Sequence, residues 1–347
     1  MGDKTNVTAA LAAVDEDYYT LRPDGNLVTQ STAASAIAEL LERLDVWAGM
    51  RVLEVGTGSG FSGALLSELV GPAGSVVSVD VVAELTTRAR DLHESQGRTN
   101  VALITGDGAL GAPGKGDFDR VVAWTTPSLL PRAWVEQAAP DAVIVTPVEL
   151  APSVRSAAIL RARVDPELGP EGVELFAGRY VEMHDVELEQ WLVPPRGVDA
   201  LVRSDEGLDL WISAPWVGRD GEAARGLLKV LADEGTTRAG VLEAGESAVD
   251  LTAYLYARHP EEISVVGLGG PLWGVGYADP EGVAVFTAAD TGSALHSGAS
   301  GALERLSVWV EDWRQTGRPG YPDLSPVLTR EDEGWRVRAE LAGDERA

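Results

Sequence analysis

The stretch RVLEVGTGSGFSGALLSEL, residues 51–69, places a glycine-rich turn between a run of strand-forming residues and a helical pattern. Gly56, Gly58 and Gly60 occupy every second position of this turn. A dinucleotide-binding turn would carry its third glycine where this chain has Phe61. The spacing therefore argues against a nicotinamide cofactor and leaves two alternatives, another nucleoside ligand or a purely structural turn.

Strand-like and helix-like segments alternate along the first half of the chain. ASAIAELLERL and GALLSELV have apolar residues at helical spacing, and VEQAAP, residues 135–140, is expected to be a short helix. The apolar runs at 75–81, 101–107, 119–125 and 142–148 are typical of strands. This alternation predicts an α/β fold with a doubly wound, mostly parallel sheet, whose ligand site lies at the carboxyl ends of the strands.

The pattern changes in the second half of the chain. Residues 193–207, VPPRGVDALVRSDEG, are rich in proline, glycine and charge and mark a boundary. We therefore expect the sheet domain at 1–198 and an α+β accessory domain at 199–347. Trp309 and Trp313 lie one helical turn apart in SGALERLSVWVEDWRQTG, and we expect them to pack in a core rather than form a contact surface.

Composition argues against several classes of function. The chain has 54 acidic and 28 basic residues, and its formal net charge of −26 would repel a nucleic acid backbone. It has no cysteine, and its four histidines lack close ligand spacing, so we expect no metal site. Because no apolar run is long enough to span a bilayer and the N-terminus carries acids instead of a signal core, we expect no membrane partner and a cytoplasmic location.

Acidic residues stand at the ends of the first three predicted strands. Glu54 lies two residues before Gly56, Asp80 ends the second strand and Asp107 follows the third. A Gly-x-Gly-x-Gly turn with such an acid resembles the nucleoside-binding turn of class I S-adenosylmethionine methyltransferases. By that resemblance Asp80 accepts hydrogen bonds from both ribose hydroxyls and Asp107 from the adenine amino group, beside the N–H of Gly108. Each acid taken alone is more often a turn or helix-cap residue, since aspartate is common at strand ends.

Several further segments narrow the resemblance to one family. They are, in order, RPDGNLVTQSTAASAIAELL, VLEVGTGSGFSGALLSELVG, VVSVDV, GDGALGAPGKGDFDRVVAWTTP, VIVTPV and WLVPP. Over residues 20–198 the chain thereby resembles the protein-L-isoaspartate O-methyltransferases. The resemblance implies a Rossmann-like class I methyltransferase domain that uses S-adenosyl-L-methionine, releases S-adenosyl-L-homocysteine, and methylates an aspartyl or isoaspartyl carboxylate of a peptide.

The same resemblance assigns roles to individual residues. Thr29, in GNLVTQ, stands where the family has an active-site serine, although a threonine before an amphipathic helix is otherwise an N-cap or turn residue. The acceptor carboxylate is already ionised at neutral pH, so catalysis requires orientation and exclusion of water rather than a general base. The implied cofactor residues are Glu54, Gly56, Thr57, Gly58, Ser59, Gly60, Asp80, Val81, Asp107 and Gly108, and the implied substrate residues are Gln30, Thr125 and Arg196.

The chain departs from the family on the acceptor side. Ser31 stands where the family has a proline, Pro195 and Arg196 replace a small polar residue after the Val-Pro pair, and residues 199–347 are additional. These departures favour a dedicated substrate, a cyclised ribosomal precursor peptide of the lanthipeptide or graspetide kind, held in part by the second domain. Its methyl ester would cyclise to aspartimide, which hydrolysis opens to isoaspartate. The alternatives are general repair of isoaspartyl proteins and an inactive, peptide-binding pseudo-enzyme.

Overall fold

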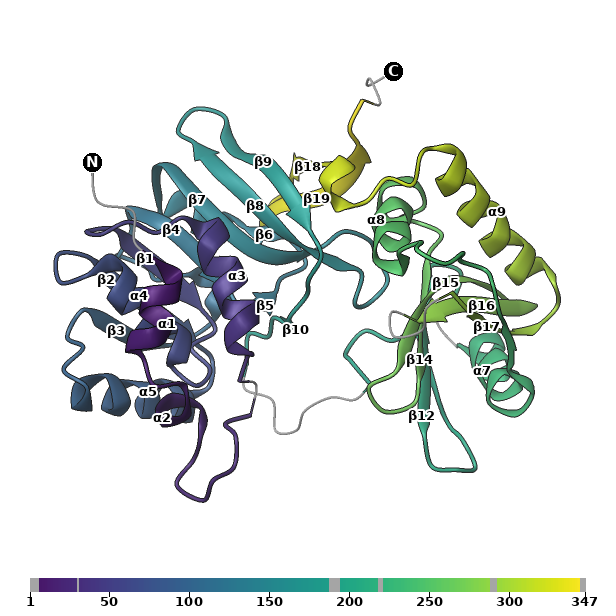
Figure 1. The fold of residues 1–347 in the computed structure, drawn as a ribbon, viewed down its shortest axis with the longest axis horizontal. Helices are drawn as coiled ribbons and strands as arrows, with labels where there is room; N and C mark the ends of the chain where they lie inside the picture. The colour runs from purple at the N-terminus through teal and green to yellow at the C-terminus, as the bar shows by residue number, and fades with distance from the viewer. Residues whose placement is uncertain (1–5, 30, 187–193, 218–220, 288–291, 344–347) are drawn as a thin grey trace.

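The computed structural model describes residues 6–29, 31–186, 194–217, 221–287 and 292–343, which form two lobes, each built on a large sheet (Figure 1). The first sheet has the strand order β3-β2-β1-β4-β7-β8-β9, in which the first five strands are parallel and the last two antiparallel. The predicted mostly parallel sheet is therefore confirmed. Its strands are β1 (Arg51–Val55), β2 (Ser75–Asp80), β3 (Val101–Thr105), β4 (Phe118–Ala123), β7 (Ala138–Glu149), β8 (Ala157–Asp165) and β9 (Gly169–Phe176).

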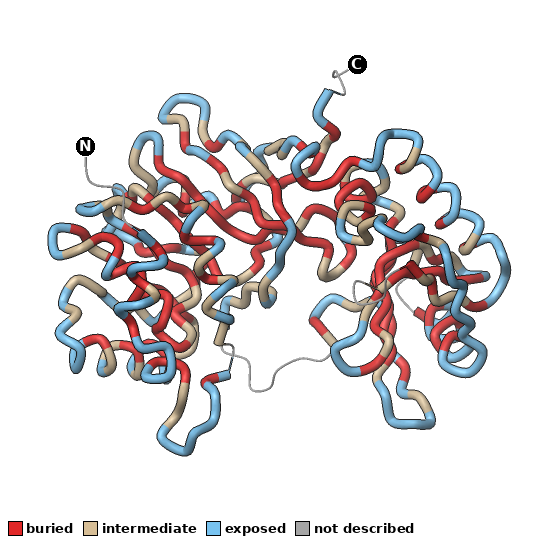
Figure 2. Tube along the Cα trace, in the orientation of Figure 1, coloured by how far each residue is buried: buried red, intermediate tan, exposed pale blue. Residues whose placement is uncertain are grey.

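Successive residues of the central strands pack on opposite faces of this sheet. Val52 and Val76 join one buried cluster with the first, third and fourth helices, whereas Leu53 and Val77 join the cluster on the other face. Figure 2 shows the central strands buried between exposed loops. The helices of this lobe are α1 (Val7–Ala13), α2 (Glu16–Thr20), α3 (Ala34–Leu44), α4 (Phe61–Val70), α5 (Ala83–Ser95) and α6 (Arg132–Glu136), with the short 3-10 helix η1 (Gly108–Leu110).

The turn between β1 and α4 can be built only with glycine. Gly56, Gly58 and Gly60 have φ angles of 93°, 52° and 86°, in the left-handed region that other residues avoid. A Cβ atom at Gly60 would also lie 3.0 Å from the Cβ of Ala89 on α5. The turn can therefore start α4 at Phe61 while holding α5 close to the sheet.

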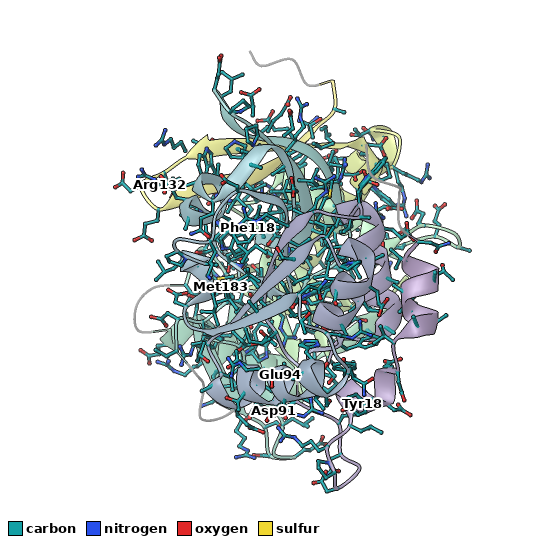
Figure 3. All side chains as sticks on the ribbon, turned by 90° about the vertical axis from the view of Figure 1, so that its left-hand side faces the viewer. Tyr18, Asp91, Glu94, Phe118, Arg132 and Met183 are labelled. Atoms are coloured by element: carbon teal, nitrogen blue, oxygen red, sulfur yellow. The ribbon has the colours of Figure 1, made fainter. Side chains whose placement is uncertain are left out.

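Helix α2 and the segment after it are tied to α5. The hydroxyls of Tyr18 and Ser95 are 2.6 Å apart, and Figure 3 shows Tyr18 at the same edge of the lobe as Asp91 and Glu94 of α5. Arg88 of α5 donates hydrogen bonds to the carbonyl oxygens of Leu21 and Ser59. Arg88 therefore links the segment that precedes Thr29 with the glycine turn.

The second lobe is an antiparallel sheet with three helices. Its strand order is β11-β12-β14-β15-β16-β17-β13. Trp309 and Trp313 of its longest helix are 0% and 1% exposed, which confirms that they are core residues. The elements are β11 (Ala200–Arg203), β12 (Asp209–Ser213), α7 (Glu222–Glu234), β13 (Thr236–Arg238), α8 (Ala248–Arg258), β14 (Ser264–Leu268), β15 (Trp273–Asp279), β16 (Gly282–Thr287), β17 (Ala294–Gly298) and α9 (Gly301–Gln315).

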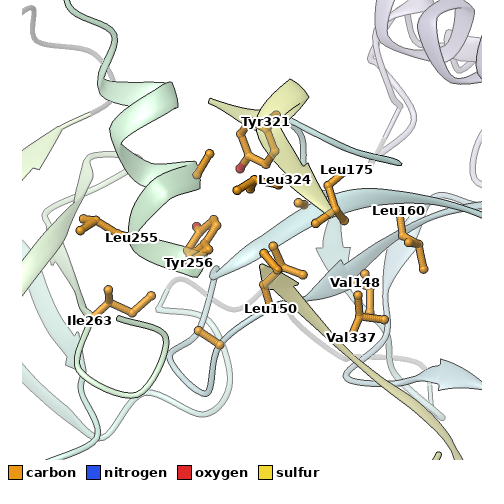
Figure 4. Packing of buried hydrophobic residues seen from close by; sticks show 14 of the residues in the cluster. Val148, Leu150, Leu160, Leu175, Leu255, Tyr256, Ile263, Tyr321, Leu324 and Val337 are labelled. Atoms are coloured by element: carbon orange, nitrogen blue, oxygen red, sulfur yellow. The ribbon is translucent and has the colours of Figure 1, made fainter. Parts of the chain in front are cut away.

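The C-terminal hairpin returns from the second lobe to the first. After the 3-10 helix η2 (Tyr321–Asp323), β18 (Leu324–Arg330) and β19 (Gly334–Leu341) form a sheet with β6 (Leu130–Pro131) of the first lobe. Figure 4 shows Leu324 and Val337 of the hairpin among Val148, Leu160 and Leu175 of the first sheet. The hairpin packs with the first sheet although it follows the second lobe in the chain, because its apolar face is buried there (Figure 4).

The helix expected at residues 135–140 is wrong in position. Helix α6 ends at Glu136, and β7 starts at Ala138. Pro140 cannot continue a helix, whereas Ala138 pairs with Phe118 at the start of β4. None of the helices in the described part of the chain is long and apolar enough to cross a membrane.

Candidate active site

A cavity of about 1170 Å³ opens at the carboxyl ends of β1, β2 and β4 and reaches the second lobe. One end is lined by the glycine turn, and the other by Gly270, Pro271 and Trp273 beside β15. This volume exceeds the range of about 300–1000 Å³ that is common for a single small ligand. The predicted site residues that line it are Thr29, Gly56, Thr57, Gly58, Ser59, Asp80, Val81, Gly108, Thr125 and Arg196.

Asp80 supplies a carboxylate to the end of the cavity that the glycine turn lines, which we call the nucleoside end. Its Oδ2 accepts a hydrogen bond from the N–H of Gly58 at 3.0 Å, and its Oδ1 accepts one from the N–H of Val82 at 2.9 Å. Burial raises the pKa of Asp80, while these backbone donors act against the rise. Each oxygen retains a lone pair, so the carboxylate that shapes the turn can also accept hydrogen bonds from a ligand.

Glu54, which was expected among the cofactor contacts, does not line the cavity. It is fully buried, and its Oε1 accepts hydrogen bonds from the indole N–H of Trp124, at 3.0 Å, and from the hydroxyl of Ser62. Burial raises the pKa of Glu54, and these donors oppose the rise. Glu54 thereby joins β1 to α4 and to the residue that follows β4.

Asp107 and Gly60 also lie outside the cavity lining. Asp107 is the N-cap of η1, where its carboxylate accepts a hydrogen bond from the N–H of Ala109. Its neighbour Gly108 does line the cavity, and a Cβ atom there would lie 2.6 Å from Cγ1 of Val55. Close approach of η1 to β1 therefore requires glycine at this position.

The predicted residues of the acceptor side include two threonines, Thr29 and Thr125. Thr29 lies four residues before Ala33, the N-cap of α3, which excludes the alternative that it caps this helix. Thr125, in the short strand β5 (Thr125–Thr126), has a buried hydroxyl with no hydrogen-bond partner among the described residues. Arg196 lines the same cavity, whereas Gln30 lies outside the described residues.

A segment after β9 reaches this site, and the sequence motifs missed it. Strand β10 (Val181–Glu182) pairs in parallel with β5. The Thr126 hydroxyl donates to the carbonyl of Tyr180, and the Met183 N–H donates to the carbonyl of Thr126. The pairing brings residues 178–184 to the cavity wall, together with Arg155 and Glu149. No local pattern marks this segment, because its partner strand lies far away in the chain.

The residues present fit S-adenosylmethionine at the nucleoside end. Gly56 and Gly58 leave backbone without side chains at the cavity wall, and Asp80 stands at the end of the neighbouring strand, where a ribose diol would donate to it. Among the described residues, no group of three or more histidines and acids is arranged to hold a metal ion. The site therefore combines a nucleoside crevice with a hydroxyl-lined acceptor end.

Comparison with known proteins identifies the relatives of the first lobe. The family model for protein-L-isoaspartate(D-aspartate) O-methyltransferase matches residues 8–180. Protein-L-isoaspartate O-methyltransferase of Ignicoccus hospitalis is 36% identical over 121 residues, and a protein of that name from Anaeromyxobacter sp. is 44% identical over 140 residues. These alignments cover 35% and 40% of this chain and 57% and 62% of the relatives, so the chain spans about three fifths of the relatives' length.

A solved structure named protein-L-isoaspartate O-methyltransferase matches with a TM-score of 0.50 at 18% identity. It covers 98% of this chain and 95% of its own, so the shared fold includes the second lobe. The family match ends at Tyr180, which leaves WLVPP outside it and shortens the resemblance expected over 20–198. Residues 8–180 of this chain belong to the protein-L-isoaspartate(D-aspartate) O-methyltransferase family.

Proposed function

We propose that this protein is an S-adenosylmethionine-dependent methyltransferase that esterifies an aspartyl or isoaspartyl carboxylate of a peptide or protein. The observation that carries the proposal is the single cavity in which Thr29 and Thr125 line the acceptor end and Asp80 the nucleoside end. These residues lie within the part of the chain that matches the family. The size of the cavity leaves room for a peptide segment beside a nucleoside.

The protein's part in this reaction is orientation. When bound, S-adenosyl-L-methionine supplies an electrophilic methyl group. Transfer of this group to the acceptor oxygen converts the cofactor to S-adenosyl-L-homocysteine. The acceptor is ionised at neutral pH, so no side chain has to remove a proton. Thr29 donates a hydrogen bond to one carboxylate oxygen and holds the other in line with the methyl group, at about 3–3.5 Å.

The ester then reacts without further help from the protein. The nitrogen of the adjacent backbone amide attacks the ester carbonyl, methanol leaves, and a cyclic aspartimide forms. Hydrolysis of this ring gives aspartate or isoaspartate. The products of the full sequence are thus methanol and a rearranged or restored backbone.

Two kinds of acceptor are compatible with this chemistry. Repair of isoaspartyl proteins agrees with the names of the relatives. Tailoring of a cyclised ribosomal peptide is the alternative, and it rests on Ser31, Pro195 and Arg196 at the acceptor side. The second lobe does not favour tailoring, because a solved structure with the relatives' name has it as well.

Methyl transfer from labelled S-adenosylmethionine tests the proposal. The acceptors are a linear isoaspartyl hexapeptide, the same hexapeptide with aspartate, and a cyclised ribosomal precursor. Fast esterification of the linear isoaspartyl peptide supports repair, and esterification confined to the cyclised precursor supports tailoring. Binding of S-adenosylmethionine without transfer to any acceptor would show a pseudo-enzyme and refute the proposed activity.

A further inference from the structure

Two arginines of the first lobe rest on tryptophans of the second at the far end of the cavity. Arg155 lies between β7 and β8, Arg179 lies between β9 and β10, and both line the cavity. The Cζ atom of Arg179 is 4.1 Å from the centroid of the Trp273 ring. That of Arg155 is 5.9 Å from the Trp273 centroid and 5.3 Å from the Trp211 centroid. Trp273 therefore orients both guanidinium groups.

In the part of the chain that the structure describes, the charge of Glu182 acts on both guanidinium groups, but not at ion-pair distance. Neither forms an ion pair or a hydrogen bond there, whereas Arg314 is 2.7 Å from a carboxylate oxygen of Glu246. Arg179 is exposed and Arg155 is half-buried, so both side chains can meet a ligand in the cavity. Desolvation of the guanidinium group lowers the pKa of Arg179, and the charge of neighbouring Arg155 acts in the same direction, whereas Tyr256 and Glu182 oppose the shift. A bound anion would offset both effects.

The backbone of Arg155 supports a role in binding. Its φ angle is 62°, a left-handed conformation that is unfavourable for a residue with a Cβ atom. Such residues persist where the surrounding structure holds them, and they are frequent at ligand sites. Here the conformation brings the Arg155 guanidinium to the cavity between Trp211 and Trp273.

The charge of the whole chain restricts which anion enters. A net charge of −26 repels polyanions at long range, so a strongly charged phosphate-rich ligand is disfavoured. A single carboxylate is repelled least, and the planar guanidinium fork matches its two oxygens. Glu182 lines the same cavity and is the acid that acts on both arginines, so two positive charges face one negative charge and leave a net positive charge for one further carboxylate.

We propose that Arg155 and Arg179, oriented by Trp273, bind a second carboxylate of the peptide whose aspartyl or isoaspartyl residue is methylated. The proposal rests on the proposed methyltransferase function. The carboxylate belongs either to an acidic side chain near the acceptor residue or to the C-terminus of the peptide. The second lobe then contributes to substrate selection through Trp273, and the protein prefers acidic acceptor peptides.

Kinetics with matched peptides test this subsite. An isoaspartyl hexapeptide carries glutamate or glutamine two residues after the acceptor, each with a free or an amidated C-terminus. We expect about a tenfold lower KM for the peptides with the added carboxylate, at unchanged kcat. If KM differs between the glutamate and glutamine peptides, the carboxylate belongs to the side chain. If KM differs between the free and amidated peptides, it belongs to the C-terminus. The preference should weaken as salt is added.

Variants assign the preference to the two arginines. Arg155→Gln combined with Arg179→Gln should raise KM for the acidic peptide to that of the neutral one, while Arg179→Lys should retain part of the preference. Arg330→Gln is the matched control, because Arg330 also lies over a tryptophan, Trp335 at 5.9 Å, but does not line the cavity. Trp273→Leu is a second variant that keeps both charges and removes their aromatic support.

Direct binding separates this proposal from the proposed function. Fluorescence anisotropy with labelled acidic and neutral peptides, in the presence of S-adenosyl-L-homocysteine, requires no turnover. If no peptide is methylated, the proposed function fails, and the anisotropy of the same two peptides still decides the subsite. Equal affinities for the two peptides, or a preference that survives in the double arginine variant, would overturn it.

Discussion

The carboxylate of Glu54 and the imidazole of His93 approach each other across Gly63 of α4. A Cβ atom added at Gly63 would lie 3.1 Å from Glu54 Oε2 and 3.3 Å from His93 Nε2. Both side chains are buried, and neither Oε2 nor either ring nitrogen has a hydrogen-bond partner among the described residues. Burial raises the pKa of Glu54 and lowers the pKa of His93 to about 4. Burial near the glycine turn thus disfavours the charged forms of both Glu54 and His93.

Replacing Gly63 should destabilise the protein although it lies in a helix. Alanine in a helix interior is ordinarily better than glycine by about 1 kcal/mol. At Gly63 the added methyl group meets Glu54 and His93, so we expect Gly63→Ala to lower the free energy of unfolding by about 1–3 kcal/mol. Gly226→Ala in α7 is the control, because Gly226 is exposed with no atom within 4 Å of an added Cβ, and it should stabilise. Urea denaturation measures both, and equal stabilisation would contradict the steric argument.

His93 should make the fold sensitive to acid. Its pKa falls from 6.5 to about 4 on folding, because burial and then the charge of Arg98 disfavour the imidazolium. Its stabilising contribution is therefore complete above pH 6.5 and is lost as the pH falls toward 4, by about 3 kcal/mol in all. The free energy of unfolding of His93→Gln should fall less over this range than that of the wild type. Parallel pH profiles for the two proteins would refute the assignment.

Asp80 should govern affinity for the cofactor. Asp80→Asn removes the charge that a ribose diol would meet, and we expect binding of S-adenosyl-L-homocysteine to weaken about 10- to 100-fold in calorimetry. Asp119→Asn is the matched control, because Asp119 also accepts a backbone hydrogen bond, from Arg51 at 2.8 Å, but lies at the opposite end of β1 and outside the cavity. Similar losses in the two variants would mean that Asp80 acts only through the fold.

Thr29 should act through its hydroxyl. Thr29→Ala should lower kcat about 10- to 100-fold, because the acceptor loses a group that aligns it with the methyl donor. Thr29→Ser retains the hydroxyl and should recover most of the rate. Binding of S-adenosyl-L-homocysteine should be unchanged in both variants. A serine variant as slow as the alanine variant would show that the methyl group of Thr29, not its hydroxyl, is what matters.

Two expectations from the sequence succeeded because their causes are local. The spacing of Gly56, Gly58 and Gly60 distinguished this turn from a dinucleotide turn, and the positive φ angles show why only glycine serves there. The alternation of apolar strands and amphipathic helices was enough for the parallel sheet, since each element's period depends on its own residues. The prediction of a helix at residues 135–140 was wrong, because pairing with β4 extends β7 over part of that segment.

The sequence by itself determined the glycine turn, the alternation of strands and helices in the first lobe and the family of residues 8–180. Only the tertiary structure decided that Glu54 anchors Trp124 rather than lining the cavity, and that Arg155 and Arg179 meet Trp273. The physical reason is the range of the interactions. Backbone conformation and hydrophobic period are properties of neighbouring residues, whereas a buried contact between distant strands depends on the packing of the whole chain.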